Sequence, residues 1–243
     1  IKKLVQNTGL PIVTHDHDFH WERGNRYISV HSEVNTLIND TFPLLLPDVR
    51  HAVINTFGVE TFRNKFNLDS TLVPNVMDFD RKYAIPNQEN RYFLKNIGVA
   101  EDEIALLQVT RIVRRKGIET AVSLIEKLND KKIKLVITGN YNDDQNREYY
   151  NEIVDQIHDL NLTNQVIFAS KSVRDHMQDI GNKGFETVML EDNYLSNEKI
   201  NRMSDIIYNV DRCREIGEFN YNLGKKYFSF KVLEEKLSDL FNF

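Results

Sequence analysis

The chain has 243 residues, of which 41% are hydrophobic and 28% are charged, and its formal net charge is -5 at pH 7. This composition can bury a sizeable core in one large domain or two smaller ones, and the negative charge argues against a nucleic-acid-binding protein, so any anion site must be local. No apolar run is long enough to span a bilayer, and the one cysteine, Cys213, excludes an internal disulfide and suits a reducing compartment. These features predict a cytoplasmic, globular protein without a transmembrane segment.

A short apolar run at residues 10–14 predicts a strand that leads into a cluster of titratable residues. The cluster reads His15-Asp16-His17-Asp18-Phe19-His20-Trp21-Glu22-Arg23. Histidine and carboxylate side chains bind transition metals, so one hypothesis is a metal-dependent phosphohydrolase centred on residues 15–18. The cluster follows no fixed ligand spacing, however, and caps, ion pairs or contacts with solvent can account for most of it. The pattern therefore favours a cluster without metal.

Short strands and helices alternate after this cluster. Apolar residues at helical spacing predict a helix near residues 34–38 that ends before Phe42-Pro43, because the residue before a proline disfavours helical geometry. A strand at 51–56, in which His51 has a structural role, a helix at 59–66 and a strand at 71–73 follow. This alternation is typical of a doubly wound α/β fold.

The middle of the chain joins an apolar strand to an amphipathic helix through a basic turn. Residues 104–109 predict a strand that is buried on both faces, and residues 118–128 predict a helix with one apolar face. Between them lie four basic residues and a glycine: Arg111, Arg114, Arg115, Lys116 and Gly117. Cations around a helix N-terminus, at the carboxyl end of a strand, favour an anion such as a diphosphate. The alternative is a solvated basic loop.

Two further apolar strands, at residues 133–139 and 165–169, lie on either side of a helix at 149–160. This β-α-β-α-β series predicts half of a Rossmann-like domain with a parallel sheet, and Gly139 ends one of its strands. Helical patterns at residues 200–207 and 228–241 follow, with Ser229 as a candidate N-cap.

The basic turn resembles a known motif. The run Thr110-Arg111-Ile-Val-Arg-Arg-Lys116-Gly117-Ile118-Glu119 is similar to the donor-phosphate motif of glycosyltransferase family 4, or group 1, whose members are retaining enzymes with the two-domain GT-B fold. In that family the arginine and the lysine bind the diphosphate of a nucleotide sugar, which the resemblance assigns to Arg111 and Lys116, with Gly117 beside them. Gly139 matches the family glycine beside the nucleotide.

The histidine cluster extends the resemblance. Val13-Thr14-His15 falls where family members carry a histidine near the donor sugar and the acceptor. A subset of the family has an extended His-Asp-His-Asp-Phe-aromatic-Trp-Glu-Arg run like this one, which makes His17 the second candidate.

The resemblance implies an α/β protein of GT-B type, with two Rossmann-like domains and parallel sheets. Residues 1–80 would form a partial N-terminal, acceptor-side domain, residues 81–90 a linker, and residues 91–243 the nucleotide-sugar domain with its closing helix. The implied activity is retaining transfer of a sugar from a UDP- or GDP-linked donor to a carbohydrate or small polyol acceptor, without metal or cofactor. The alternatives are the phosphohydrolase and a non-catalytic nucleotide-sugar-binding protein.

The resemblance ends after the strand at residues 165–169. Family members carry a glycine-rich loop and two paired glutamates there, which hold the donor ribose and the sugar hydroxyls. This chain continues from Ala169-Ser170 into Lys171-Ser172, and nothing up to Phe185 replaces the glutamates. We therefore expect residues to be absent near Ser170–Ser172 and the chain as shown to be inactive by itself.

Overall fold

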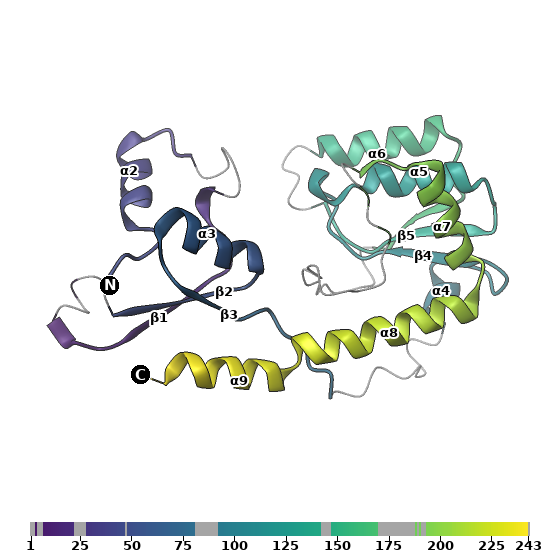
Figure 1. The fold of residues 1–243 in the computed structure, drawn as a ribbon. Helices are drawn as coiled ribbons and strands as arrows, with labels where there is room; N and C mark the ends of the chain where they lie inside the picture. Colours follow the sequence, from purple (N-terminus) through teal and green to yellow (C-terminus); the bar gives the residue numbers. More distant parts are fainter. Residues whose placement is uncertain are drawn as a thin grey trace. The chain divides into compact units, whose positions relative to one another are not determined.

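The computed structural model describes residues 3, 7–21, 28–46, 48–80, 92–141, 147–169, 188, 190 and 193–242 (Figure 1). The chain divides into two compact units. The first, here called the N-terminal unit, contains residues 1–81 and 222–243, and the second, the C-terminal unit, contains residues 82–221. Within the described residues, each unit contains one three-stranded parallel sheet.

The N-terminal unit alternates strands and helices as predicted, and its sheet has the order β1-β2-β3. Its elements are β1 (Ile12–Asp16), α2 (Ser32–Thr41), β2 (Val49–Val53), α3 (Thr56–Phe66), β3 (Ser70–Leu72) and α9 (Phe230–Phe241). Helices α3 and α9 cover opposite faces of the sheet (Figure 1). On the α3 side, Val53 packs with Phe62 and Phe19, and on the α9 side Ala52 and Val73 pack with Leu240.

The observed ends of these elements can be compared with the predicted ones. Helix α2 stops at Thr41, before Phe42-Pro43, as predicted. Strand β2 ends earlier than the predicted residue 56 because Asn55 caps α3, with its side-chain oxygen accepting a hydrogen bond of 2.7 Å from Gly58 N. Strand β1 runs two residues further than predicted, so His15 and Asp16 belong to the strand itself.

The C-terminal unit has a sheet of order β4-β5-β6. Its elements are α4 (Phe93–Asn96), β4 (Ile104–Gln108), the 3₁₀ helix η2 (Arg114–Lys116), α5 (Ile118–Leu128), β5 (Ile133–Ile137), α6 (Glu148–Asp159), β6 (Val166–Phe168) and α7 (Asn197–Ile207). The larger cluster of buried residues lies between the sheet and helices α5 and α6. A second cluster, around Val99, Val136 and Ala169, covers the other face. Strand β5 is thus packed on both faces, as its apolar run predicted. The edge strand β4 is only partly buried, and Leu107 is 58% exposed, so the predicted burial of residues 104–109 on both faces is wrong.

Helix α8 (Val210–Phe228) leads from the C-terminal unit, which includes residues up to Tyr221, into the N-terminal unit. Ser229 lies at the N-cap of α9 as predicted, but its side chain makes no capping hydrogen bond. Among the described helices, none has both the length and the hydropathy needed to cross a membrane. The predicted linker at 81–90 and the suspected gap at Ser170–Ser172 lie outside the described residues.

Candidate functional site

The basic turn is fixed to the core of the C-terminal unit at its centre. Ile112 is buried, and its amide donates a hydrogen bond of 2.8 Å to the carbonyl oxygen of Asn140. Gln108, at the end of β4, donates from Nε2 to Thr110 Oγ1 and to the carbonyl oxygen of Lys116. These bonds hold both ends of the turn, while the side chain of Arg111 is exposed. The turn is therefore an ordered platform for its cations.

Gly117 connects this turn to α5 in a conformation that favours glycine. Its backbone is left-handed, with φ 60° and ψ 42°, and its amide donates to Arg114 O at 3.1 Å. A Cβ atom at this position would also lie 3.2 Å from Asn193 Oδ1. Any other residue would thus be strained there, in backbone and in packing. Gly117 sets the reversal that places Lys116 directly before the helix.

The cations of the turn differ in what they contact. Arg114 makes two hydrogen bonds to the carboxylate of Glu152, at 2.8 and 2.5 Å, and its guanidinium lies 5.2 Å from the centre of the Tyr149 ring. The hydrogen bonds to Glu152, and then its charge, raise the pKa of Arg114. Within the described part of the chain, neither Arg115 nor Lys116 has an ion-pair partner. Lys116, which is half-buried, is therefore better placed than Arg114 to bind an anion.

The N-terminus of α5 is occupied by a side chain that the sequence did not indicate. The hydroxyl of Tyr149 accepts a hydrogen bond of 3.0 Å from Ile118 N and donates a short one to the carboxylate of Glu119. Burial, and then the bond to Glu119, raise the pKa of Tyr149 above its ordinary value. The first amide of α5 is therefore already bonded to a neutral hydroxyl. In this arrangement a bound diphosphate would rely on the side chains of the turn.

Gly139 lies against the backbone of the basic turn. A Cβ atom there would overlap the carbonyl group of Thr110 and lie 2.6 Å from the Cα of Arg111. Thr138 N donates to Gln108 O at 3.2 Å just before this contact. The fold thus brings Arg111 and Gly139 together. Strand β5 ends at Ile137, two residues before the predicted end at residue 139.

The histidine cluster of β1 does not converge on one point. Side chains of a strand alternate between its two faces, so His15 and Asp16 point to opposite sides of the sheet. His15 Nε2 lies 3.2 Å from Val73 O, whereas Asp16 accepts a hydrogen bond of 2.8 Å from the hydroxyl of Thr14. His17 follows the strand, and its ring centre lies 4.6 Å from that of His15.

The second half of the cluster is largely packing. Phe19 is buried and stacks on Trp21, with 4.6 Å between the ring centres, and Lys65 Nζ lies 4.5 Å above the centre of the Trp21 ring. His20 Nε2 is 2.9 Å from Asn39 Oδ1 of α2. This packing frames a pocket of about 430 Å³, lined by residues 15–20 together with Ile38, Phe42 and Pro43.

The geometry bears directly on the phosphohydrolase hypothesis. In the ranges that the structure describes, no three histidine, cysteine, aspartate or glutamate side chains are placed to hold a metal ion. Within the cluster, His15 and Asp16 lie on opposite faces of the sheet. The hypothesis thus has no ligand set among the described residues, and Asp16 has a structural partner instead.

Comparisons with known sequences find a glycosyltransferase match in the part of the chain that contains the basic turn. Residues 91–180 match the family model for "Glycosyl transferases group 1". The chain is 33% identical over 125 residues to mannosylglucosylglycerate synthase of Petrotoga mobilis and 36% identical over 118 residues to that of Thermotoga maritima. These alignments cover 51% and 49% of this chain but only 29% and 27% of the relatives. The chain thus spans less than a third of the length of these curated relatives.

Solved structures show the same fold. The glycosyltransferase from Rickettsia africae has a TM-score of 0.66 at 12% identity, covering 98% of this chain and 77% of its own. HepE from Anabaena, solved in complex with UDP-glucose, has a TM-score of 0.67 at 14% identity, with 97% and 73% covered. Sucrose-phosphate synthase from Thermosynechococcus elongatus gives 0.65 at 16%, with 99% and 69% covered. The chain therefore has the GT-B fold, and its residues 91–180 match the group 1, or family 4, glycosyltransferases that the resemblance of its basic turn predicted.

Proposed function

We propose that this protein is a retaining glycosyltransferase that moves a sugar from a UDP- or GDP-linked donor to a hydroxyl of a carbohydrate or small polyol acceptor. The observation that carries the proposal is the basic turn, which lies at the carboxyl end of β4 inside the family match. There Arg111 and Lys116 bind the diphosphate and offset the negative charge that develops on it as the sugar leaves, which is the main electrostatic task of the reaction.

The two glycines have separate parts in this proposal. Gly117 holds the reversal before α5, so that Lys116 extends from a fixed backbone. Gly139 lets the backbone of Thr110 and Arg111 lie directly against the end of β5, and the nucleotide is assigned to the neighbourhood of this contact. A UDP-linked donor is supported by the fold shared with HepE, which was solved with UDP-glucose.

The acceptor site is assigned to the pocket of the histidine cluster. Its volume of about 430 Å³ lies within the range of small-molecule sites, and it combines the imidazoles of His15 and His17 with an apolar wall from Ile38 and Phe42. We assign to His15 the positioning of the sugar or the acceptor, and to His17 a supporting role. The names of the relatives, mannosylglucosylglycerate synthases, support a glycosylated glycerate as the acceptor class.

Nucleotide binding tests whether the basic turn binds the diphosphate. Replacing Lys116 with alanine should weaken UDP or GDP binding by about 1.5 to 3 kcal/mol, as expected for the loss of a hydrogen bond to a charged group. Arg114→Ala is the matched control, because its guanidinium is already bonded to Glu152, and its effect should stay within about threefold in Kd. Isothermal titration measures both, and thermal melting confirms that both variants fold. Equal losses at the two positions would mean that only the overall charge of the turn matters.

Catalysis requires that the sugar be held in position as well as the diphosphate. In the family that the chain resembles, paired glutamates, which this chain lacks after Ala169, fix the sugar ring relative to the diphosphate. Small misplacement of reacting atoms costs on the order of a hundredfold in rate. We therefore expect the 243-residue chain to bind UDP yet to transfer sugar at least about a hundredfold more slowly than the mannosylglucosylglycerate synthases. A radiolabel transfer assay with UDP- and GDP-linked hexoses and glucosylglycerate measures this. Turnover equal to that of the relatives would show that other residues replace the glutamates.

A further inference from the structure

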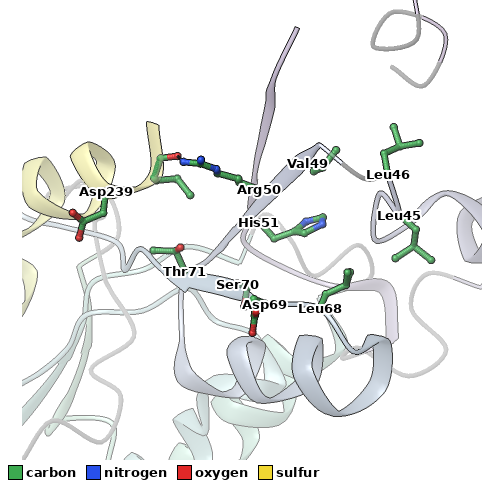
Figure 2. A pocket seen from close by; sticks show the side chains of 11 residues that line it. Leu45, Leu46, Val49, Arg50, His51, Leu68, Asp69, Ser70, Thr71 and Asp239 are labelled. Carbon is green, nitrogen blue, oxygen red and sulfur yellow. Dashed lines mark hydrogen bonds between the residues drawn. The ribbon is translucent and has the colours of Figure 1, made fainter. Parts of the chain in front are cut away.

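A second pocket lies in the N-terminal unit, at the amino ends of β2 and β3 (Figure 2). His15 and His17, in contrast, lie at the carboxyl end of β1. This amino-end pocket has a volume of about 690 Å³ and combines leucine and valine side chains with several polar groups. Its volume is in the range of pockets that bind small molecules. The transferase proposal uses none of its residues.

Three polar side chains form a row across the sheet beside this pocket. Thr14 on β1 is the register partner of His51 on β2, and His51 is the partner of Ser70 on β3. Partners in register point to the same face, so the row crosses all three strands on the α3 side. Figure 2 shows the His51 imidazole pointing toward Leu45 and Leu68, while Arg50 points the opposite way, toward α9.

The hydrogen bonds of this row determine which nitrogen of His51 carries a proton. The Thr14 hydroxyl donates to the carboxylate of Asp16, at 2.8 Å. Its only proton is then used, so at 2.9 Å the Nδ1 of His51 must donate to Thr14 Oγ1. A neutral imidazole protonated on Nδ1 has a lone pair on Nε2. The side chain of His51 is only 3% exposed, and no described residue bonds to its Nε2.

Ser70 supplies a second polar group. Its Oγ is buried and has no hydrogen-bond partner among the described residues, which is uncommon for a buried polar atom. One ligand hydroxyl could satisfy both groups, because it can donate to His51 Nε2 and accept from Ser70 Oγ–H. The rest of such a ligand would meet apolar walls from Leu45, Leu46 and Leu68.

We propose that the amino-end pocket binds a small alcohol or phenol, whose hydroxyl pairs with His51 and Ser70 and whose apolar body packs against the leucines. The pocket shares no residue with those assigned to the donor and the acceptor, so it does not depend on the transferase proposal. An apolar body alone would leave both polar groups unsatisfied. The hydroxyl is therefore what selects the ligand.

Phenol and anisole form a matched pair of probes, because they share an aromatic ring but only phenol has a hydroxyl to donate. The titration is followed by ¹⁵N–¹H NMR of the His51 ring at pH 8 in the 243-residue chain, and the same spectrum reports the protonation of Nδ1 directly. Phenol should bind with a Kd on the order of 1 mM, as expected for a fragment of its size, and should shift the Nε2 resonance. Anisole should bind at least about fivefold more weakly. Equal binding of both probes, or binding of neither, would overturn the proposal.

Two variants locate the contact. Ser70→Ala should weaken phenol binding about three- to tenfold and leave anisole unchanged, whereas Ser32→Ala, which removes an exposed hydroxyl of α2, should change neither. Thr14→Val removes the acceptor for Nδ1 and should shift the His51 proton toward Nε2, with loss of phenol binding. Phenol binding that survives both pocket variants would place the probe elsewhere and reject the site.

Discussion

The basic turn of the C-terminal unit and the histidine cluster of the N-terminal unit are both short runs of functional side chains, yet the fold treats them differently. The turn joins a strand to a helix, and a buried Ile112 and a left-handed Gly117 hold its cations at one end of the sheet. The cluster begins within β1, so alternation sends His15 and Asp16 to opposite faces. Adjacent residues in the sequence therefore gather in a turn and separate in a strand.

In both regions, some of the side chains have a structural role. In the turn, Arg114 is bonded to Glu152, and Tyr149 occupies the start of α5. In the cluster, Phe19 and Trp21 belong to the core of the N-terminal unit. Each region thus combines groups that maintain the fold with groups that are available to a ligand, and substitutions can separate the two sets.

The largest expected effect on stability comes from replacing Gly139, which lies directly against the backbone of the basic turn. Gly139→Ala should destabilise the protein by about 3 kcal/mol or more, because the new Cβ would overlap the Thr110 carbonyl and force the backbone apart. Gly217→Ala is the control, since a Cβ there meets nothing within 4 Å in the middle of α8, and it should stabilise by about 0.5 to 1 kcal/mol. Urea denaturation measures both. A Gly139→Ala protein as stable as the wild type would show that the turn is a loose loop.

Tyr149 tests whether the start of α5 is capped as described. Tyr149→Phe should cost about 1 to 2 kcal/mol, because Ile118 N loses its acceptor and Glu119 its donor in a buried setting. Tyr194→Phe should cost less than about 0.5 kcal/mol, since that side chain is 69% exposed. Chemical denaturation of the two variants gives the difference. Equal and small losses would show that the Tyr149 hydroxyl does not stabilise the start of α5.

The same variant has a pH signature. The folded protein raises the pKa of Tyr149, so the stability that its neutral hydroxyl contributes is fully present below the unfolded tyrosine pKa of about 10. It is lost as pH rises from there through the raised folded value. The stability gap between wild type and Tyr149→Phe should therefore be constant from pH 7 to 9 and shrink above pH 10. A gap that shrinks below pH 9 would point to another group.

The sequence predicted the architecture well, because periodicity and apolar runs report burial directly. The strands of both sheets and the stop of α2 before Phe42-Pro43 followed from local patterns. Other features needed the fold. The bond between Tyr149 and Ile118 spans 31 residues, and that between Thr14 and His51 spans 37, and no local pattern signals either pair. The register that aligns Thr14, His51 and Ser70 also depends on how three separate strands pair.

The smallest effect concerns Arg114 and Glu152, and it decides whether the basic turn has distinct structural and binding cations. The pair is exposed, at 64% and 53% of the two side chains, so a double-mutant cycle with Arg114→Ala and Glu152→Ala should give a coupling of only about 0.2 to 1 kcal/mol. Added salt should reduce it, because solvent ions screen exposed charges. Glu152→Ala alone releases the guanidinium of Arg114 without removing it, and UDP affinity should then rise by no more than about twofold. A larger gain would mean that Glu152 restrains a cation that can bind the diphosphate, and Arg114 would join Arg111 and Lys116 as a donor-binding residue.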